Sequence, residues 1–437
     1  MNKKTIRRDF TKYVSLSVLG MLCFSGFVIV DTLFIATALG PNGLASLNIS
    51  IAVFSILQGV GLMVGIGGAT RYAILRSESN FTGASSVFMH SLALGGFLAV
   101  VFVTTGAFFS VPLARVLGAD GEVLTMAVEF IQTTLLFSPV LMLNNILIAF
   151  VRNDNNPKLS MAGMVTASLC NIVLDYIFLF PLGLGMFGAA LATGLSVILS
   201  IAVLSLHFVR GRSGFGLRRC RIYIKKIADV IALGASALVG ELAFAIALIS
   251  FNLVILGIEG NIGVAAFGVV ANIAIVVLNI FIGVAQGVQP LMSKGHGLKD
   301  SKLVKLTLKY ALVLVILLAV VVYGVVNFYS YSIVAAFNSE GDDTLARLAA
   351  SGLRIYFIGL IFAGVNMIIA AFFSAVDNAR TGLVISTLRS CVIIIPLLLV
   401  FSAVLGMDGV WFSFVVAEFI VSVIAVVFVY RRLRWSI

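Results

Sequence analysis

Long apolar runs dominate this chain of 437 residues, and short polar joints separate them. A hydrocarbon core about 30 Å thick needs roughly 20 apolar residues per helix, so the pattern predicts about twelve membrane-spanning helices. The first predicted span ends near Leu39, and the others cover approximately 44–71, 85–110, 123–150, 158–181, 186–209, 227–256, 261–290, 303–335, 344–374, 381–404 and 408–430. The pattern therefore predicts an all-α polytopic membrane protein without a large soluble domain.

Composition supports the same class. Hydrophobic residues make up 61% of the chain, charged residues only 11%, and the mean hydropathy is +1.16. Soluble domains carry about 25% charged residues, so an ordinary soluble protein is excluded. The first apolar run is too long for a signal-peptide core, and we interpret it as a span. The four widely spaced cysteines indicate neither a disulfide framework nor a metal site; they are Cys23, Cys170, Cys220 and Cys391.

Basic residues gather on one side of the predicted topology. That side holds 26 of the 29 Lys and Arg residues, and the opposite side holds only Arg115, Arg347 and Arg354. Because basic flanks stay in the cytoplasm, both termini are predicted to be cytoplasmic. This topology and attraction to anionic membrane lipid explain the net charge of +11 without a nucleic-acid partner.

The two halves of the chain resemble each other. Three joints recur at an offset of about 220 residues: the segments that begin at Gly40 and Gly260, at Ala149 and Phe372, and at Gly185 and Gly406. The repeat predicts an N-terminal six-helix bundle (1–209), a basic cytoplasmic linker (210–226) and a C-terminal six-helix bundle (227–437). Six spans per half make the halves parallel, a plan that suits alternating access around a central cleft. A duplicated scaffold without a cleft is the alternative.

Carboxylates inside predicted spans are candidates for chemistry, because each costs about 2.5–3.5 kcal/mol at the bilayer centre. Asp31 lies in the outer half of the first span. Asp175 shares a helix face with Asn171, four residues earlier, and Thr193 lies near the start of the sixth span. Two carboxylates that meet in a medium of low dielectric constant require a shared proton or cation. Alternatively, neighbouring amides and hydroxyls satisfy each acid separately.

The second half carries two further acids within its spans. Glu241 is accompanied by amides on the seventh and eighth spans, at Asn252, Asn272, Asn279 and Gln286. Together they predict a cleft that accepts a cationic substrate, and a satisfied structural acid is an equally strong interpretation of Glu241. Glu418 is interpreted as a packing or interfacial residue.

Several of these segments together resemble the multidrug and toxic compound extrusion (MATE) family over nearly the whole chain. The resemblance rests on residues 31–45, 150–161, 171–178, 184–193 and 283–291. The Gln-Gly-Val-Gln-Pro run at 286–290 and the Asn-Asp-Asn-Asn-Pro joint at 153–157 are most similar to the MepA-like branch. No single motif is decisive, but their order and spacing together are specific.

The resemblance implies a V-shaped, twelve-helix antiporter of a bacterial inner membrane, working as a monomer without a cofactor and exporting amphipathic or cationic compounds in exchange for H⁺ or Na⁺. It implies a cation-coupling cluster at Asp31, Asn171, Asp175 and Thr193, and Glu241 occupies a region that resembles the seventh-span Glu of the NorM-like branch, whereas the substrate cleft near Glu241, Asn272, Asn279 and Gln286 is predicted from the residues themselves. One departure is clear. The NorM-like branch has a coupling Asp on the tenth span, and here 362–366 contains no acid. Asp377 is matched instead with Asp154 in the joint of the first half.

Other functions remain as alternatives. A flippase or exporter of a lipid-linked substrate or a specific metabolite shares the two-bundle plan but favours a cationic cleft, whereas the charges expected here are acidic. An intramembrane enzyme is disfavoured because the three histidines fall near helix ends and no His-Glu-x-x-His or Gly-x-Ser-x-Gly motif occurs. A receptor or scaffold would leave the intramembrane acids unexplained.

Overall fold

The computed structural model describes residues 2–211, 213–217, 220–335, 337 and 342–434. These residues form helices and contain no strand. The elements are α1 (Lys3–Ser77), α2 (Phe81–Val116), α3 (Gly121–Leu136), α4 (Ser138–Asn153), α5 (Pro157–Leu179), α6 (Gly185–Val209), α7 (Ile224–Gly297), α8 (Ser301–Phe328), α9 (Ser330–Ala335), α10 (Asp343–Ala375), α11 (Ala379–Thr387), the π-helical turn η1 (Leu388–Val392) and α12 (Ile394–Arg434).

Twelve spans emerge once the long helices are divided where they break. Eight helical stretches of the described chain are long and apolar enough to cross a membrane, and α3 with α4 forms a further span bent by 53°. Three of the eight break at a glycine with positive φ, at Gly40 in α1, Gly260 in α7 and Gly406 in α12. Dividing each of these in two turns eight stretches into eleven, and the bent pair is the twelfth. The predicted twelve-helix architecture is confirmed.

The fourth predicted span, 123–150, is not one straight helix. It is divided at Phe137, which ends α3, and Pro139 lies in the first turn of α4. Proline lacks the amide hydrogen that would continue the preceding helix, so a new helix begins there. The predicted span 303–335 likewise consists of α8 and the short helix α9.

The internal repeat is visible in the backbone. At each of the three matched joints, a residue with positive φ in the first half has a counterpart in the second, and a fourth pair was not detected in the sequence. The pairs are Gly40 with Gly260, Asn155 with Asp377, Gly185 with Gly406, and Ser79 with Lys299. The match of Asp377 with Asp154 was therefore wrong by one position. Asp377 corresponds to Asn155, because both follow a helix end by two residues.

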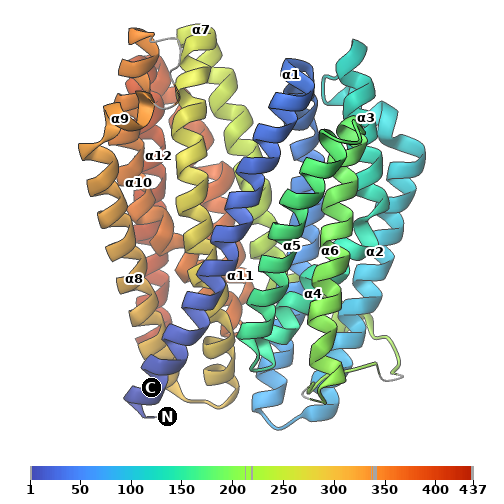
Figure 1. Cartoon of the computed structure of the whole chain (residues 1–437). Helices are drawn as coiled ribbons and strands as arrows, with labels where there is room; N and C mark the ends of the chain where they lie inside the picture. The colour runs from blue at the N-terminus through green and yellow to red at the C-terminus, as the bar shows by residue number, and fades with distance from the viewer. Residues whose placement is uncertain (1, 212, 218–219, 336, 338–341, 435–437) are drawn as a thin grey trace.

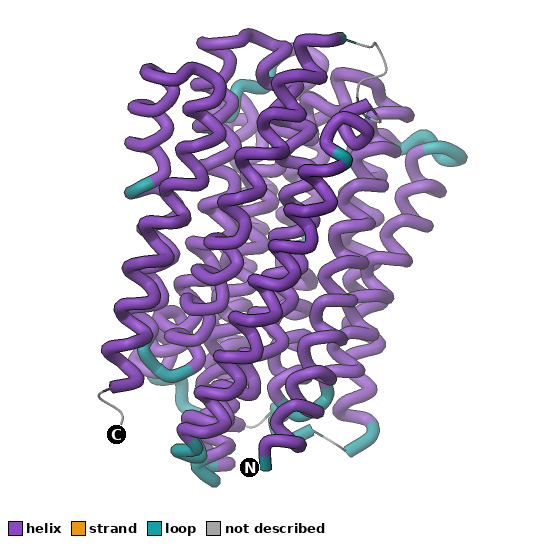
Figure 2. Tube along the Cα trace, turned by 90° about the vertical axis from the view of Figure 1, so that its left-hand side faces the viewer, coloured by secondary structure: helices purple, strands orange, loops and turns teal. Residues whose placement is uncertain are grey.

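Two helix bundles stand side by side, with α1 and α7 between them (Figure 1). Helices α2 to α6 lie in one bundle and α8 to α12 in the other. The described ends, Asn2 and Arg434, lie at the same end of the molecule in both views (Figures 1 and 2). We call this end the terminal end. Buried apolar residues form one large cluster, mostly from the second half, and three smaller clusters, mostly from the first half.

The two bundles approach most closely through glycines of α1 and α7. A Cβ atom at Gly287 would lie 2.7 Å from Val14 Cα, and one at Gly283 would lie 2.8 Å from Val18 Cα. On the other side of the same interface, Gly67 faces the backbone of Val230. Small residues let membrane helices pack backbone to backbone. These contacts join the bundles in the half of the molecule that holds the terminal end.

Candidate functional site

The structure brings together the four residues predicted for cation coupling. Helices α1, α5 and α6 supply Asp31, Asn171 with Asp175, and Thr193. Asn171 and Asp175 are buried, and the Asn171 side-chain amide donates a hydrogen bond to Thr193 Oγ1 at 3.3 Å. The carboxyl groups of Asp31 and Asp175 are close enough to interact with each other. The i,i+4 spacing of Asn171 and Asp175 on α5 directs both side chains toward α1 and α6.

Acceptor oxygens in this cluster outnumber donors. Four buried oxygens have no hydrogen-bond donor among the described residues: Asp31 Oδ1, both Asp175 carboxylate oxygens and Asn171 Oδ1. Buried acceptors without donors are costly, especially when they carry charge. A proton shared by the two carboxyls, or a small cation among the oxygens, would satisfy them together. The cluster is therefore chemically suited to exchange a cation.

The predicted cleft residues of the second half lie in different surroundings. Glu241 is partly buried on α7 beside Gly59 of α1, which belongs to the other half. Asn279 donates a hydrogen bond to Ser25 Oγ at 2.9 Å, so this amide ties α7 to α1. Gln286 also contacts the first bundle, as described below, whereas Asn272 is exposed. Their role in a substrate cleft stays a prediction.

A polar layer closes the bundle interface near the terminal end. Gln289 donates to Thr70 Oγ1 at 2.6 Å and accepts from the Asn153 amide at 3.1 Å. Arg71 of α1 forms an ion pair with Asp229 of α7 at 2.8 Å and a two-pronged pair with Asp377, at 2.8 and 3.0 Å. In the predicted topology, Arg71 is one of the 26 basic residues on the cytoplasmic side. Its partners could not be identified, because they lie far from it along the chain.

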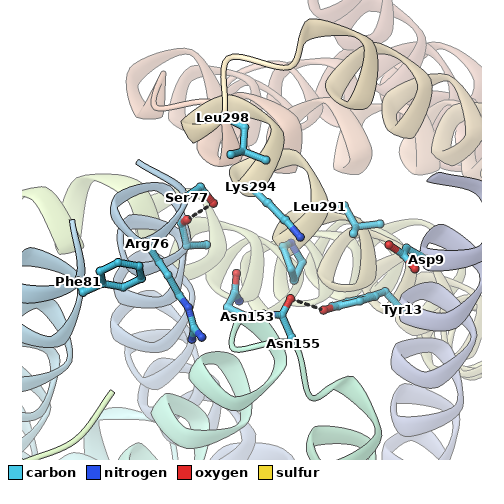
Figure 3. Close-up of a pocket in the computed structure, with 12 residues that line it drawn as sticks. Asp9, Tyr13, Arg76, Ser77, Phe81, Asn153, Asn155, Leu291, Lys294 and Leu298 are labelled. Carbon is cyan, nitrogen blue, oxygen red and sulfur yellow. Dashed lines mark hydrogen bonds between the residues drawn. The ribbon is translucent and has the colours of Figure 1, made fainter. Parts of the chain in front are cut away.

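A cavity of about 260 Å³ opens beside this layer, between α1, the α4–α5 joint and α7 (Figure 3). Charged and polar side chains from all three segments line it, among them Asp9, Tyr13, Arg76, Asn153, Asn155 and Lys294. Tyr13 donates a hydrogen bond to Asn155 at 3.5 Å across the cavity wall. The terminal end of the interface is therefore polar and hollowed rather than a continuous apolar seam.

Asp154 is the centre of a buried network that sequence reasoning missed. Its carboxylate accepts hydrogen bonds from Tyr72 Oη at 2.7 Å, from the Gly214 backbone amide at 2.7 Å and from His207 Nε2 at 2.8 Å, and it pairs with Arg76. Gly214 belongs to the predicted linker, so the network fastens the linker to the first bundle. Four partners on one carboxylate indicate a structural anchor.

A second buried network joins three helical segments of the second half. Glu418 of α12 accepts bonds from Arg389 Nε and Nη2 at 3.0 and 2.8 Å, and from the Asn366 amide of α10 at 2.7 Å. Of the two interpretations of Glu418, packing or interfacial, the interfacial one was wrong, because its side chain is 2% exposed. Arg389 was counted among the 26 basic residues of the cytoplasmic side, but it lies on the π-helical turn and pairs with the buried Glu418. An arginine inside an apolar span was the available signal for this ion pair.

The repeat extends to one hydrogen bond in the core of each bundle. Ser200 donates to Asn144 Oδ1 at 2.8 Å in the first half, and Ser422 donates to Asn366 Oδ1 at 2.9 Å in the second. The charged groups do not repeat in this way. The two halves therefore share a backbone architecture and one core hydrogen bond, but their charged residues differ.

Comparisons with known proteins agree over most of the chain. The model of the family described as MatE matches residues 17–177 and 237–400, leaving out the linker. A multidrug export protein MepA from Staphylococcus saprophyticus is 24% identical over 415 residues, covering 94% of this chain and 91% of that protein, and the MepA of Staphylococcus aureus gives the same values. A solved outward-facing multidrug resistance MATE family transporter superposes with a TM-score of 0.93 at 22% identity, covering 99% of this chain and 96% of that one.

Proposed function

Because the chain belongs to the MatE family, we propose that it exports amphipathic, often cationic compounds in exchange for H⁺ or Na⁺. The relatives it matches are multidrug export proteins. The observation that carries the proposal is the group of four buried oxygens without donors at Asp31, Asn171 and Asp175. A cation that enters this group removes an unfavourable surplus of acceptors, so binding and release of the cation can be coupled to a change of conformation.

In the proposed cycle, the bundles 1–209 and 227–437 move as units about the α1–α7 interface, with 210–226 as the linker. The close packing at the terminal end supports an arrangement that is closed on this side. Cation binding at the cluster between α1, α5 and α6 changes the charge next to the moving helix α1. The substrate leaves on one side of the membrane, and the cation is carried in the opposite direction.

We also propose that the protein works as a monomer in a bacterial inner membrane, with both termini in the cytoplasm. Support comes from the basic residues at the terminal end, which hold that end on the cytoplasmic side. The cavity at this end, with Arg76 and Lys294 in its wall, would then face the cytoplasm and the anionic headgroups of the inner leaflet.

Transport by the purified protein in proteoliposomes tests the function. A pH gradient and a Na⁺ gradient are imposed separately, and uptake of ethidium into inside-out vesicles is followed by fluorescence. We expect one gradient to drive uptake and an ionophore that dissipates it to stop uptake. Uptake that ignores both gradients would contradict the proposed exchange.

Glu241 should contribute to the recognition of cationic substrates. Its carboxylate lies at the bundle interface, so we expect Glu241→Gln to lower ethidium transport about tenfold, equivalent to about 1.4 kcal/mol of lost attraction, and to leave a neutral substrate nearly unchanged. Glu259→Gln is the matched control, because Glu259 lies on the same helix but is exposed. Equal transport of both substrates by the Glu241→Gln protein would argue against a cation-binding role.

A further inference from the structure

Arg152 of α4 is a buried cation without a counter-charge at the bundle interface. Its side chain is 2% exposed, and among the described residues its hydrogen-bond partner is Gln286 Oε1 of α7, at 2.7 Å. The Nε atom has no acceptor, and none of the ion pairs in the described part of the chain includes Arg152. Arg71 and Arg76, at the same end of the molecule, both have a carboxylate partner.

The burial of Arg152 favours one state of the bundle interface over the other. A guanidinium keeps its charge under all ordinary conditions, so it cannot relieve its burial by losing a proton. One neutral amide does not replace the water that a buried charge gives up. Because the Arg152 side chain crosses from the first bundle to α7 of the second, separating the bundles at the terminal end would hydrate it. Its charge therefore disfavours the closed interface that the structure shows.

Arg71 acts in the opposite sense. It extends from α1 to Asp229 and Asp377, and both acids belong to the second half. Separation at the terminal end breaks these charge-assisted bonds, which are stronger than bonds between neutral groups. The interface thus holds one arginine that is satisfied only when the bundles are together and one that is satisfied better when they are apart.

We propose that Arg152 is a gating residue of the transport cycle, which drives the bundles apart at the terminal end against the closing force of Arg71. The proposal rests on the proposed function, because it assumes that the interface opens during transport. Gln286 gives Arg152 a neutral hydrogen-bond acceptor and no counter-charge. The closed state is therefore not stabilised so strongly that the bundles cannot separate. Removing the charge of Arg152 would leave the closing contacts unopposed.

Distances between spin labels on the two bundles test the proposal. Lys158 and Lys302 are exposed at the terminal end, at the starts of α5 and α8. Cysteines at these positions, in a protein whose four native cysteines are replaced, report opening at that end. A second pair at Asp120 and Arg347, exposed near the opposite end, reports the complementary motion. Double electron–electron resonance gives the populations of short and long distances in lipid nanodiscs.

We expect Arg152→Met to raise the closed-to-open ratio at the terminal end about tenfold and Arg71→Met to lower it. Because the wild type could already be closed, Arg152→Met is also measured in the Arg71→Met protein, where it should restore the closed population. Arg152→Lys keeps the charge and should preserve the wild-type distribution. It also separates the effect of charge from that of packing.

Substitution of Gln286 tests whether the charge of Arg152 sets the direction of the shift between closed and open populations. Gln286→Glu gives Arg152 a counter-charge and should favour closure in the wild type. In the Arg152→Met protein the same change buries an unpaired acid and should favour opening. The same direction in both backgrounds, or no shift from Arg152→Met in either background, would overturn the gating role. If neither label pair changes distance at any pH, Na⁺ concentration or substrate concentration, the alternating motion of the proposed function fails instead.

Discussion

Asp31→Asn is expected to abolish cation-coupled export and to leave a folded, membrane-inserted protein. The substitution removes one of the two carboxyls that can share a proton or cation at the α1–α5 contact. It also places an amide donor beside the Asp175 oxygens, which have none in the wild type. The variant therefore imitates the cation-bound cluster permanently. We expect gradient-driven efflux to fall by at least about a hundredfold, because the cation can no longer be exchanged.

The measurement is drug efflux in proteoliposomes under the driving gradient, together with thermal unfolding in detergent. A satisfied cluster should unfold at the same temperature as the wild type or at a higher one. Asp31→Glu, which keeps the carboxyl, should retain part of the activity. Asp408→Asn changes an exposed acid at a span junction and serves as the control. Wild-type efflux from a well-expressed Asp31→Asn protein would remove Asp31 from the coupling cluster.

The twelve spans and the repeat could be predicted because each depends on local sequence. Apolar runs of the right length predict spans, and glycines such as Gly40 and Gly260 recur where the chain needs a left-handed residue. The division of the fourth span at Phe137 was missed because the apolar run continues through it. The cost of a charge in lipid was sufficient to select Asp31 and Asp175 before any contact between them was known.

Partnerships across helices could not be predicted in the same way. Both Arg389 and Glu418 were visible as charges in apolar surroundings, but pairing them requires knowing how α12 packs against the π-helical turn. The rule that basic residues flank spans predicted Arg389 at the membrane surface. In the structure it lies within the bundle, paired with the carboxylate of Glu418. Similarly, the position in the second half that corresponds to Asp31 is Phe251, which stacks on Phe267 with ring centroids 5.3 Å apart. The sequence around Phe251 does not indicate that this position forms an aromatic pair where the first half has an acid.

Arg389→Leu is expected to destabilise the second bundle by about 3–5 kcal/mol, because it leaves Glu418 charged and buried, with Asn366 as its one hydrogen-bond donor in the described part of the chain. Thermal unfolding in detergent micelles and the yield of folded protein measure the loss. Arg354→Leu is the control. Arg354 lies on α10 but is exposed, and its loss should cost less than about 1 kcal/mol.

The double variant Arg389→Leu/Glu418→Gln separates the two contributions of the pair. Its glutamine is neutral and can still accept the Asn366 hydrogen bond, so we expect it to recover most of the stability lost in Arg389→Leu. Recovery would show that the penalty of the single change comes from the stranded carboxylate and not from the lost contacts of the arginine. A double variant as unstable as Arg389→Leu would instead mean that the guanidinium holds α10, α12 and the π-helical turn together. In that case the π-helical turn should straighten into a regular helix when Arg389 is removed, because it is the arginine that requires the turn to face Glu418.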